Sequence, residues 1–187
     1  MDSRWIGALV AVLIVAVVAW LMVRSWQRRS RRDRTLSAYP LPASHGAPVL
    51  DAEVLYVATT PVGTPLERLA MQGLAFRGAG HVEVLREGVV LRIAGETASF
   101  LPADRIVTAG AASYAIDRGV EPGGLVAITW IGKVTGTGDM DEAEPRVDSY
   151  LRARHPGDSA RIIAAVNDIA AAPMAQRQDH ESEASDD

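Results

Sequence analysis

Apolar residues follow two different patterns along this chain. Residues 5–23 form an uncharged run of 19 residues, WIGALVAVLIVAVVAWLMV. As a helix this run is roughly 28 Å long, close to the hydrocarbon thickness of a bilayer. After residue 50, apolar residues come in short runs separated by glycine, proline and other turn residues. The first pattern predicts a transmembrane helix over residues 5–23, and the second predicts a mainly β domain.

The β pattern is clearest in residues 81–93, HVEVLREGVVLRI, where two alternating runs flank a turn predicted at Glu87-Gly88. Further strands are predicted over residues 52–60, 97–102, 105–110, 113–116, 125–131 and 147–151. Residues 64–74 are compatible with a helical turn or with a loop. Short strands at such regular spacing indicate a small antiparallel barrel or sandwich.

A predicted linker precedes the β region, and one predicted helix follows it. Residues 35–50 contain three prolines among Ser, Ala and Gly, which is typical of a linker. Residues 160–171 carry aliphatic side chains at helical spacing, so a helix is expected to cap the barrel and stop at Pro173. The side chains on this face are Ile162, Ile163, Val166 and Ile169. The folded domain is therefore expected over residues 51–172, with a disordered acidic tail over residues 173–187.

Charge is unevenly distributed on the two sides of the apolar run. Residues 1–4 carry one Arg and one Asp, whereas residues 24–34 carry six Arg and one Asp, a net charge of +5. The membrane-orienting arginines are Arg24, Arg28, Arg29, Arg31, Arg32 and Arg34. Because positive flanks stay on the cytoplasmic side, we predict a single-pass protein of the inner (plasma) membrane. Residues 1–4 would lie outside, and the basic juxtamembrane segment (24–34) and the domain would be cytoplasmic.

A cleaved signal peptide is the alternative interpretation of the apolar run. Such a peptide has a basic start, an apolar core of about 7–15 residues and a small-residue cleavage site. Here the start, MDSR, is nearly neutral, the core is longer, and arginine follows it. These features favour an uncleaved anchor.

Composition and spacing exclude several kinds of site. Residues 35–187 carry 12 basic and 21 acidic side chains, a net charge of −9, which argues against a nucleic-acid partner. The absence of cysteine excludes disulfides and thiol nucleophiles. The acidic stretch 136–144, GTGDMDEAE, does not place its carboxylates at the spacing of a calcium-binding EF-hand loop. The same stretch and RGAGH (77–81) also lack the pattern of a phosphate-binding loop.

Histidines and serines give no catalytic or metal-binding pattern either. The histidines His45, His81, His155 and His180 are scattered, without the spacing of metal ligands. The serines Ser99, Ser113 and Ser149 lack a partner base in the sequence pattern. We therefore predict no catalytic residue, no metal and no cofactor, and we interpret Trp130 as a core residue.

Three features carry a resemblance to a known family: the anchor followed by arginines, the stretch GGLVAITWIG (123–132), and the closing helix SARIIAAVNDIA (159–170). Their order resembles actinobacterial single-span membrane proteins with a bacterial pleckstrin-homology-like (PH-like) domain, often described loosely as transporters or export proteins. The resemblance implies a PH-like barrel of about seven short antiparallel strands with one C-terminal capping helix.

Lipid-headgroup recognition is not carried over from the wider superfamily. Its lipid-binding members cluster basic residues near the first strands, and this chain has no tight basic pair there. The basic residues of that region are Arg68, Arg77, Arg86 and Arg92, and Lys133 lies in another loop.

The function that follows from these expectations is a membrane-anchored cytoplasmic domain that acts as a protein-binding or scaffold module. The bilayer would hold the N-terminal helix. An unidentified protein partner would bind at an exposed strand edge or in the groove beside the capping helix. The alternatives are an accessory subunit of a transport or export system, and an enzyme with an unrecognised site.

Overall fold

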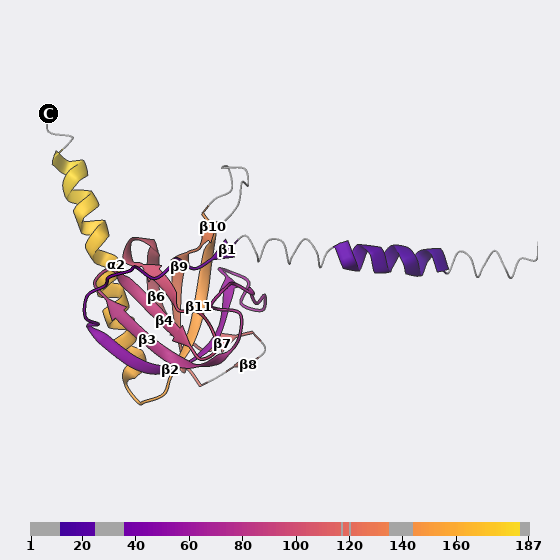
Figure 1. Ribbon diagram of the computed structural model, residues 1–187, viewed down its shortest axis with the longest axis horizontal. Coiled ribbons are helices and arrows are strands. Elements are labelled where there is room, and N and C mark those ends of the chain that lie inside the picture. Colours follow the sequence, from indigo (N-terminus) through magenta and orange to yellow (C-terminus); the bar gives the residue numbers. More distant parts are fainter. Residues whose placement is uncertain (1–11, 25–35, 117, 120, 135–143, 184–187) are drawn as a thin grey trace, which may run out of the picture.

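The computed structural model describes residues 12–24, 36–116, 118–119, 121–134 and 144–183 (Figure 1). Within this part of the chain a β domain is followed by a long C-terminal helix. The elements are β1 (Leu36–Ser37), β2 (Leu50–Pro61), β3 (Gly78–Leu85), β4 (Gly88–Ile93), β5 (Ser99–Pro102), η1 (Ala103–Arg105), β6 (Ile106–Ala112), β7 (Tyr114–Ala115), β8 (Arg118–Gly119), β9 (Leu125–Ile131), β10 (Lys133–Val134), β11 (Arg146–Ala153) and α2 (Asp158–Glu183).

Seven of these strands form one antiparallel sheet that curls into an open barrel (Figure 1). The strand order is β5-β4-β3-β2-β11-β9-β6, so β2 and β11 are central and β5 and β6 are the two edges. η1 connects the two edge strands along the chain, and α2 packs against β6 and η1. The predicted barrel of seven short antiparallel strands with a C-terminal helix is confirmed.

The core lies between the concave face of the sheet and the first part of α2. In β3, Val82 and Val84 are fully buried, whereas Glu83 between them is only half-buried on the other face. On α2 the predicted apolar face is confirmed, because Ile162 and Val166 are buried in the same core cluster. Burial of a side chain of this size contributes about 1.5–3 kcal/mol, which holds the helix on the barrel. Trp130 is also fully buried, as predicted.

The β3–β4 hairpin turns one residue earlier than predicted. The turn residues are Arg86 and Glu87, and Gly88 already pairs with Leu85 as the first residue of β4. A side chain at Gly88 would place its Cβ 2.2 Å from the carbonyl oxygen of Leu101 on β5. The glycine is therefore needed for the close approach of β5, and not for the turn itself.

A continuous chain of hydrogen bonds crosses the buried side of the sheet. Trp130 Nε1, which can only donate, donates to Ser149 Oγ at 3.0 Å. At the other end the hydroxyl of Tyr56 donates to the carbonyl oxygen of Leu74 at 2.8 Å. The intervening distances are 2.7 Å from Ser149 Oγ to Thr59 Oγ1 and 2.9 Å from Thr59 Oγ1 to Tyr56 Oη. The two ends fix the direction, so Ser149 donates to Thr59 and Thr59 donates to Tyr56.

The predicted linker, residues 35–50, is in part an element of the domain. Leu36–Ser37 forms β1, which pairs with β10, and Tyr39 pairs with Phe100 on β5. The prediction was wrong here because prolines exclude a central strand but are tolerated at a sheet edge. Pro40 follows the residue whose N–H and C=O make the edge pairing.

The helix α2 also extends beyond its predicted end. It passes through Pro173 and ends at Glu183, so the prediction of disorder was wrong for residues 173–183, and residues 184–187 lie outside the described part. Pro removes one N–H donor, but the following residues are mainly Met, Ala, Gln, Arg and Glu, which favour helix. In Figure 1 the last part of α2 extends away from the barrel.

The predicted transmembrane segment is described only in part. Residues 12–24 are helical and every side chain among them is exposed, while residues 5–11 lie outside the described part. Among the residues that the structure describes, no helix has both the length and the apolar character needed to cross a membrane. The guanidinium of Arg24 lies over the ring of Trp20, with 5.6 Å to the ring centroid.

Candidate functional site

A groove lies between α2 and the start of β2. Its volume is about 680 Å³. One wall comes from α2, where lining residues recur every three or four positions and therefore lie along one side of the helix. The other wall comes from Val49 and Leu50 and from Arg86 in the β3–β4 turn. The lining residues of the helix are Arg161, Ala164, Ala165, Asp168, Ile169 and Ala172.

The floor of this groove is aliphatic, and its rim is charged. Val49 is 57% exposed and lies immediately before β2, where its N–H donates to the carbonyl oxygen of Val84 at 2.8 Å. Alanines on α2 leave the space opposite Val49 open. At the rim, Arg161 donates to Asp158 at 2.9 Å. Arg86 is exposed, and no carboxylate among the described residues pairs with it.

A second hollow, of about 430 Å³, lies over β2, β3 and β4 at the side of the barrel. Small residues, Ala79 and Gly80, line it together with charged side chains. Among these charged residues are Glu53, His81 and Arg92, which stand next to one another across the three strands. The arrangement is a ladder of cross-strand neighbours on the outer face of the sheet.

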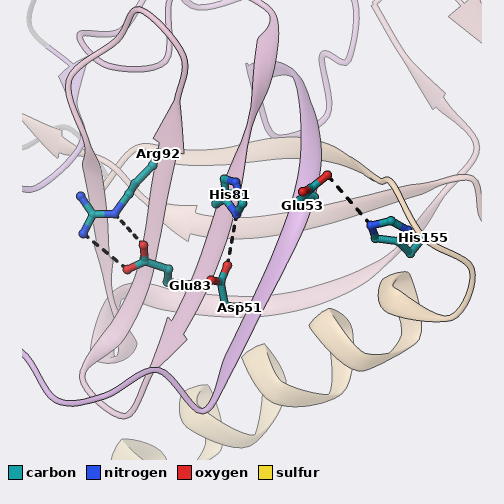
Figure 2. A network of polar contacts seen from close by, with 6 residues as sticks. All are labelled: Asp51, Glu53, His81, Glu83, Arg92 and His155. Carbon is teal, nitrogen blue, oxygen red and sulfur yellow. Dashed lines mark hydrogen bonds and ion pairs between the residues drawn. The ribbon is translucent and has the colours of Figure 1, made fainter.

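Acidic and basic side chains on this outer face pair with one another (Figure 2). Arg92 Nε donates to Glu83 at 2.6 Å, and this hydrogen bond raises the pKa of Arg92. His81 Nδ1 lies 3.4 Å from Asp51 Oδ1. His155 Nε2 lies 4.0 Å from Glu53 Oε2. Pairs exposed to this extent contribute about 0–1 kcal/mol each, so we interpret this face as solvated surface.

Both edges of the sheet are covered within the described part of the chain. On β6, the side-chain amide of Asn167 on α2 makes the pair of backbone hydrogen bonds that a neighbouring strand would make. Its Oδ1 accepts from the N–H of Ala109 at 2.8 Å, and its Nδ2 donates to the carbonyl oxygen of Ala109 at 2.9 Å. On β5, Tyr39 pairs with Phe100. Of the two binding surfaces expected from the sequence, the groove beside the helix is therefore the open one.

The structure separates the basic residues singled out in the sequence. Arg68 donates to the carbonyl oxygen of Val57 at 2.9 Å, whereas Arg86 lies at the groove and Arg92 on the outer face. Lys133 lies in β10. These four side chains therefore lie in four separate places among the described residues.

The remaining candidate residues are dispersed or lie outside the described part. Ser149 and Ser99 are buried, and Ser113 Oγ accepts from the N–H of Gly123 at 3.1 Å. Among the described residues, no group of three or more His, Asp or Glu side chains could hold a metal ion. Most of the acidic stretch (residues 136–143) and five orienting arginines lie outside the described part. The outside arginines are Arg28, Arg29, Arg31, Arg32 and Arg34.

Sequence reasoning missed the residues that define the groove and the covered edges. Asn167 lay within the predicted helix, but an asparagine in a helix gives no sign that it will pair with a strand. Tyr39 and Val49 lay in the predicted linker. The signal available for Tyr39 was an aromatic residue flanked by aliphatic ones, LSAYPL, in an otherwise small and polar segment.

Comparison with known proteins identifies the fold family. The sequence model described as "Bacterial PH domain-like" matches residues 35–167. The chain belongs to this family. The match includes the segment around Tyr39, in agreement with its place in this PH-like domain.

Two further comparisons give no information about function. A chain of the solved structure "The 8S snRNP Assembly Intermediate" is 12% identical, with a TM-score of 0.46; the alignment covers 72% of the PH-like protein and 89% of that chain. This similarity is too weak to support an argument about function. No curated protein matches the sequence.

Proposed function

We propose that this PH-like protein is a membrane-anchored binding module that holds a segment of a partner protein in the groove beside α2. The observation that supports this proposal best is the groove itself, with its aliphatic floor and charged rim. Exposed aliphatic residues that form a concave surface are typical of protein-interaction sites. The outer face in Figure 2 is a weaker candidate because its charges are already paired.

The charges at the rim favour a partner segment with apolar residues and a carboxylate. Arg86 is exposed and pairs with no described carboxylate, so a carboxylate of the partner would supply the missing charge. Arg161 also lines the groove, and its charge is shared with Asp158. Asp168 on the same wall would disfavour a second acidic residue beside it. Apolar contacts would supply affinity, and Arg86 would supply orientation.

The membrane anchor is a second part of the proposal. An apolar helix whose side chains are all exposed in residues 12–24 needs a covering environment, and a bilayer provides one. The arginines after it favour an orientation in which the PH-like domain would lie on the cytoplasmic side of the plasma membrane. The anchor would keep the groove close to partners that are themselves at the membrane.

Site-specific crosslinking tests the groove. The chain has no cysteine, so Val49→Cys in the full protein creates a single attachment point for a photo-activated crosslinker. We expect a discrete adduct with a partner in native membranes. Ala164→Glu places a charge in the groove and should abolish the adduct, whereas Ala160→Glu, on the same helix but outside the groove lining, should retain it. An adduct that survives Ala164→Glu would contradict the proposal.

A further inference from the structure

The β5 edge is covered by a short N-terminal segment, residues 36–41, which we call the strap. Its central pairing is with Phe100. The N–H of Tyr39 donates to the carbonyl oxygen of Phe100 at 3.0 Å, and the N–H of Phe100 donates to the carbonyl oxygen of Tyr39 at 3.1 Å. Two such bonds between one pair of residues are those of an antiparallel strand. The strap thus occupies the β5 edge as an added strand would.

Side chains of the strap pack against apolar and glycine positions of the barrel. Tyr39 and Leu41 pack against an apolar cluster made of Leu85, Val90 and Phe100. At the start of the strap, Leu36 lies beside Gly132, where a Cβ would come within 3.2 Å of the leucine side chain. The barrel therefore contacts both the backbone and the side chains of the strap, at the β5 edge around Tyr39 and beside β10 around Leu36.

The strap is less firmly attached than the cover of the other edge. Asn167, which covers β6, belongs to the helix whose apolar face is part of the core. No side chain of the strap is fully buried, and Pro40 is exposed. The strap's ladder of consecutive strand pairs is the two-residue one of Leu36–Ser37 with Lys133–Val134. Leu36, Ala38 and Tyr39 pack against the main core cluster, but none of them is fully buried, so detachment of the strap leaves the buried members of that cluster in place.

The segment after the strap can act as a hinge. Residues 42–48, PASHGAP, begin and end with proline and form neither helix nor strand. Proline-rich segments are extended, at about 3.1 Å per residue, so seven residues span roughly 20 Å. That length allows the strap to reach a neighbouring domain when the hinge opens.

We propose that the β5 edge is an interface between two copies of this protein, in which each copy places its strap on the β5 edge of the other. A second copy is the occupant whose fit the structure shows, because its strap makes the same contacts that the strap makes here. Exchange therefore loses no contacts and costs mainly the entropy of association. The proposal rests on the membrane anchor of the proposed function, since confinement to one membrane raises the effective concentration of the copies.

A two-chain disulfide experiment tests the exchange. Ser37 and Lys133 are register partners, and the chain contains no cysteine of its own. Full-length Ser37→Cys and full-length Lys133→Cys, with different tags, are co-expressed and the isolated membranes are mildly oxidised. A disulfide between the two tagged chains requires the strap of one copy to lie on the other. The control pair combines Ser37→Cys with Ala160→Cys, an exposed position on α2.

We expect at least about tenfold more mixed disulfide from the test pair than from the control pair, because register partners are held at high effective concentration. Tyr39→Pro removes the N–H that pairs with Phe100 and should reduce the yield toward the control level. A yield equal to that of the control pair, or one unchanged by Tyr39→Pro, would overturn the exchange. Carbonate extraction of the same membranes reports the anchor separately, so failure of the anchor is distinguishable from failure of the exchange.

Discussion

Tyr56 is the last donor in a buried chain of four hydrogen bonds that begins at Trp130. Because every member donates in the same direction, each hydroxyl is polarised by the one before it. The carbonyl oxygen of Leu74, which ends the chain, belongs to the long β2–β3 connection. Tyr56 therefore holds this connection, which has no regular structure, against the sheet.

We predict that Tyr56→Phe changes how stability depends on alkaline pH. Burial raises the pKa of Tyr56 to about 12, from 10.0. Its stabilising contribution is therefore complete below pH 10 and is lost as pH rises from 10 through 12, because the unfolded chain ionises first. A shift of this size corresponds to about 2–3 kcal/mol. Urea unfolding of wild type and Tyr56→Phe at a series of pH values measures the difference.

At neutral pH the variant should be less stable by about 1 kcal/mol, because Leu74 and Thr59 each lose a hydrogen-bond partner. Between pH 10 and 12 the variant should lose less stability than the wild type, so the difference should shrink. Burial also raises the pKa values of Tyr39 and Tyr150, so both proteins keep some alkaline slope. Parallel pH profiles for the two proteins would show that Tyr56 is not the group responsible.

At the scale of elements, strands were predicted most accurately where the local order of apolar and turn residues determines their bounds. The strand over residues 125–131 has the predicted bounds, since its aliphatic residues are flanked by glycines. The strap was missed because its pairing depends on a remote partner, Phe100, rather than on its own sequence. The position of the groove beside the helix was predicted, but its lining residues were not. Its lining could not be predicted because Val49 and Ile169 meet only in the folded barrel.

Asn167→Ala tests the cover of the β6 edge. The substitution leaves the N–H and C=O of Ala109 without their present partner, at a cost of about 1–3 kcal/mol. It also frees an edge strand, so we expect thermal unfolding at lower temperature and greater aggregation. The matched control is Asp168→Ala, which changes the adjacent exposed residue of α2 and should alter stability by less than about 0.5 kcal/mol. Equal effects of the two substitutions would argue against a role for Asn167 at the edge.

At the scale of the whole molecule, the strap shortens the tether between the proposed anchor and the domain. Eleven residues, 25–35, separate the helical residues 12–24 from the strap, and a flexible chain of that length would span roughly 17–20 Å. The domain, residues 36–172, carries 11 basic and 16 acidic side chains, a net charge of −5. Repulsion from anionic lipids acts over a Debye length of about 8 Å. With the proposed anchor, a tether of this length would hold the domain near the membrane, while the net charge of the domain would disfavour its adsorption to the lipid.

The orientation of the chain is the last prediction, and it depends on the six arginines after the apolar run. Their positive charge should keep the C-terminal side in the cytoplasm, so a cytoplasm-specific reporter fused after Asp187 should be active. Replacement of all six arginines by glutamine should divide the chains between both orientations, as measured by a paired reporter that is active only outside. Arg4→Gln, the control, removes a charge from the opposite flank and should leave the reporter signal unchanged. External reporter activity with all six arginines present would reverse the topology and place the groove on the other side of the membrane.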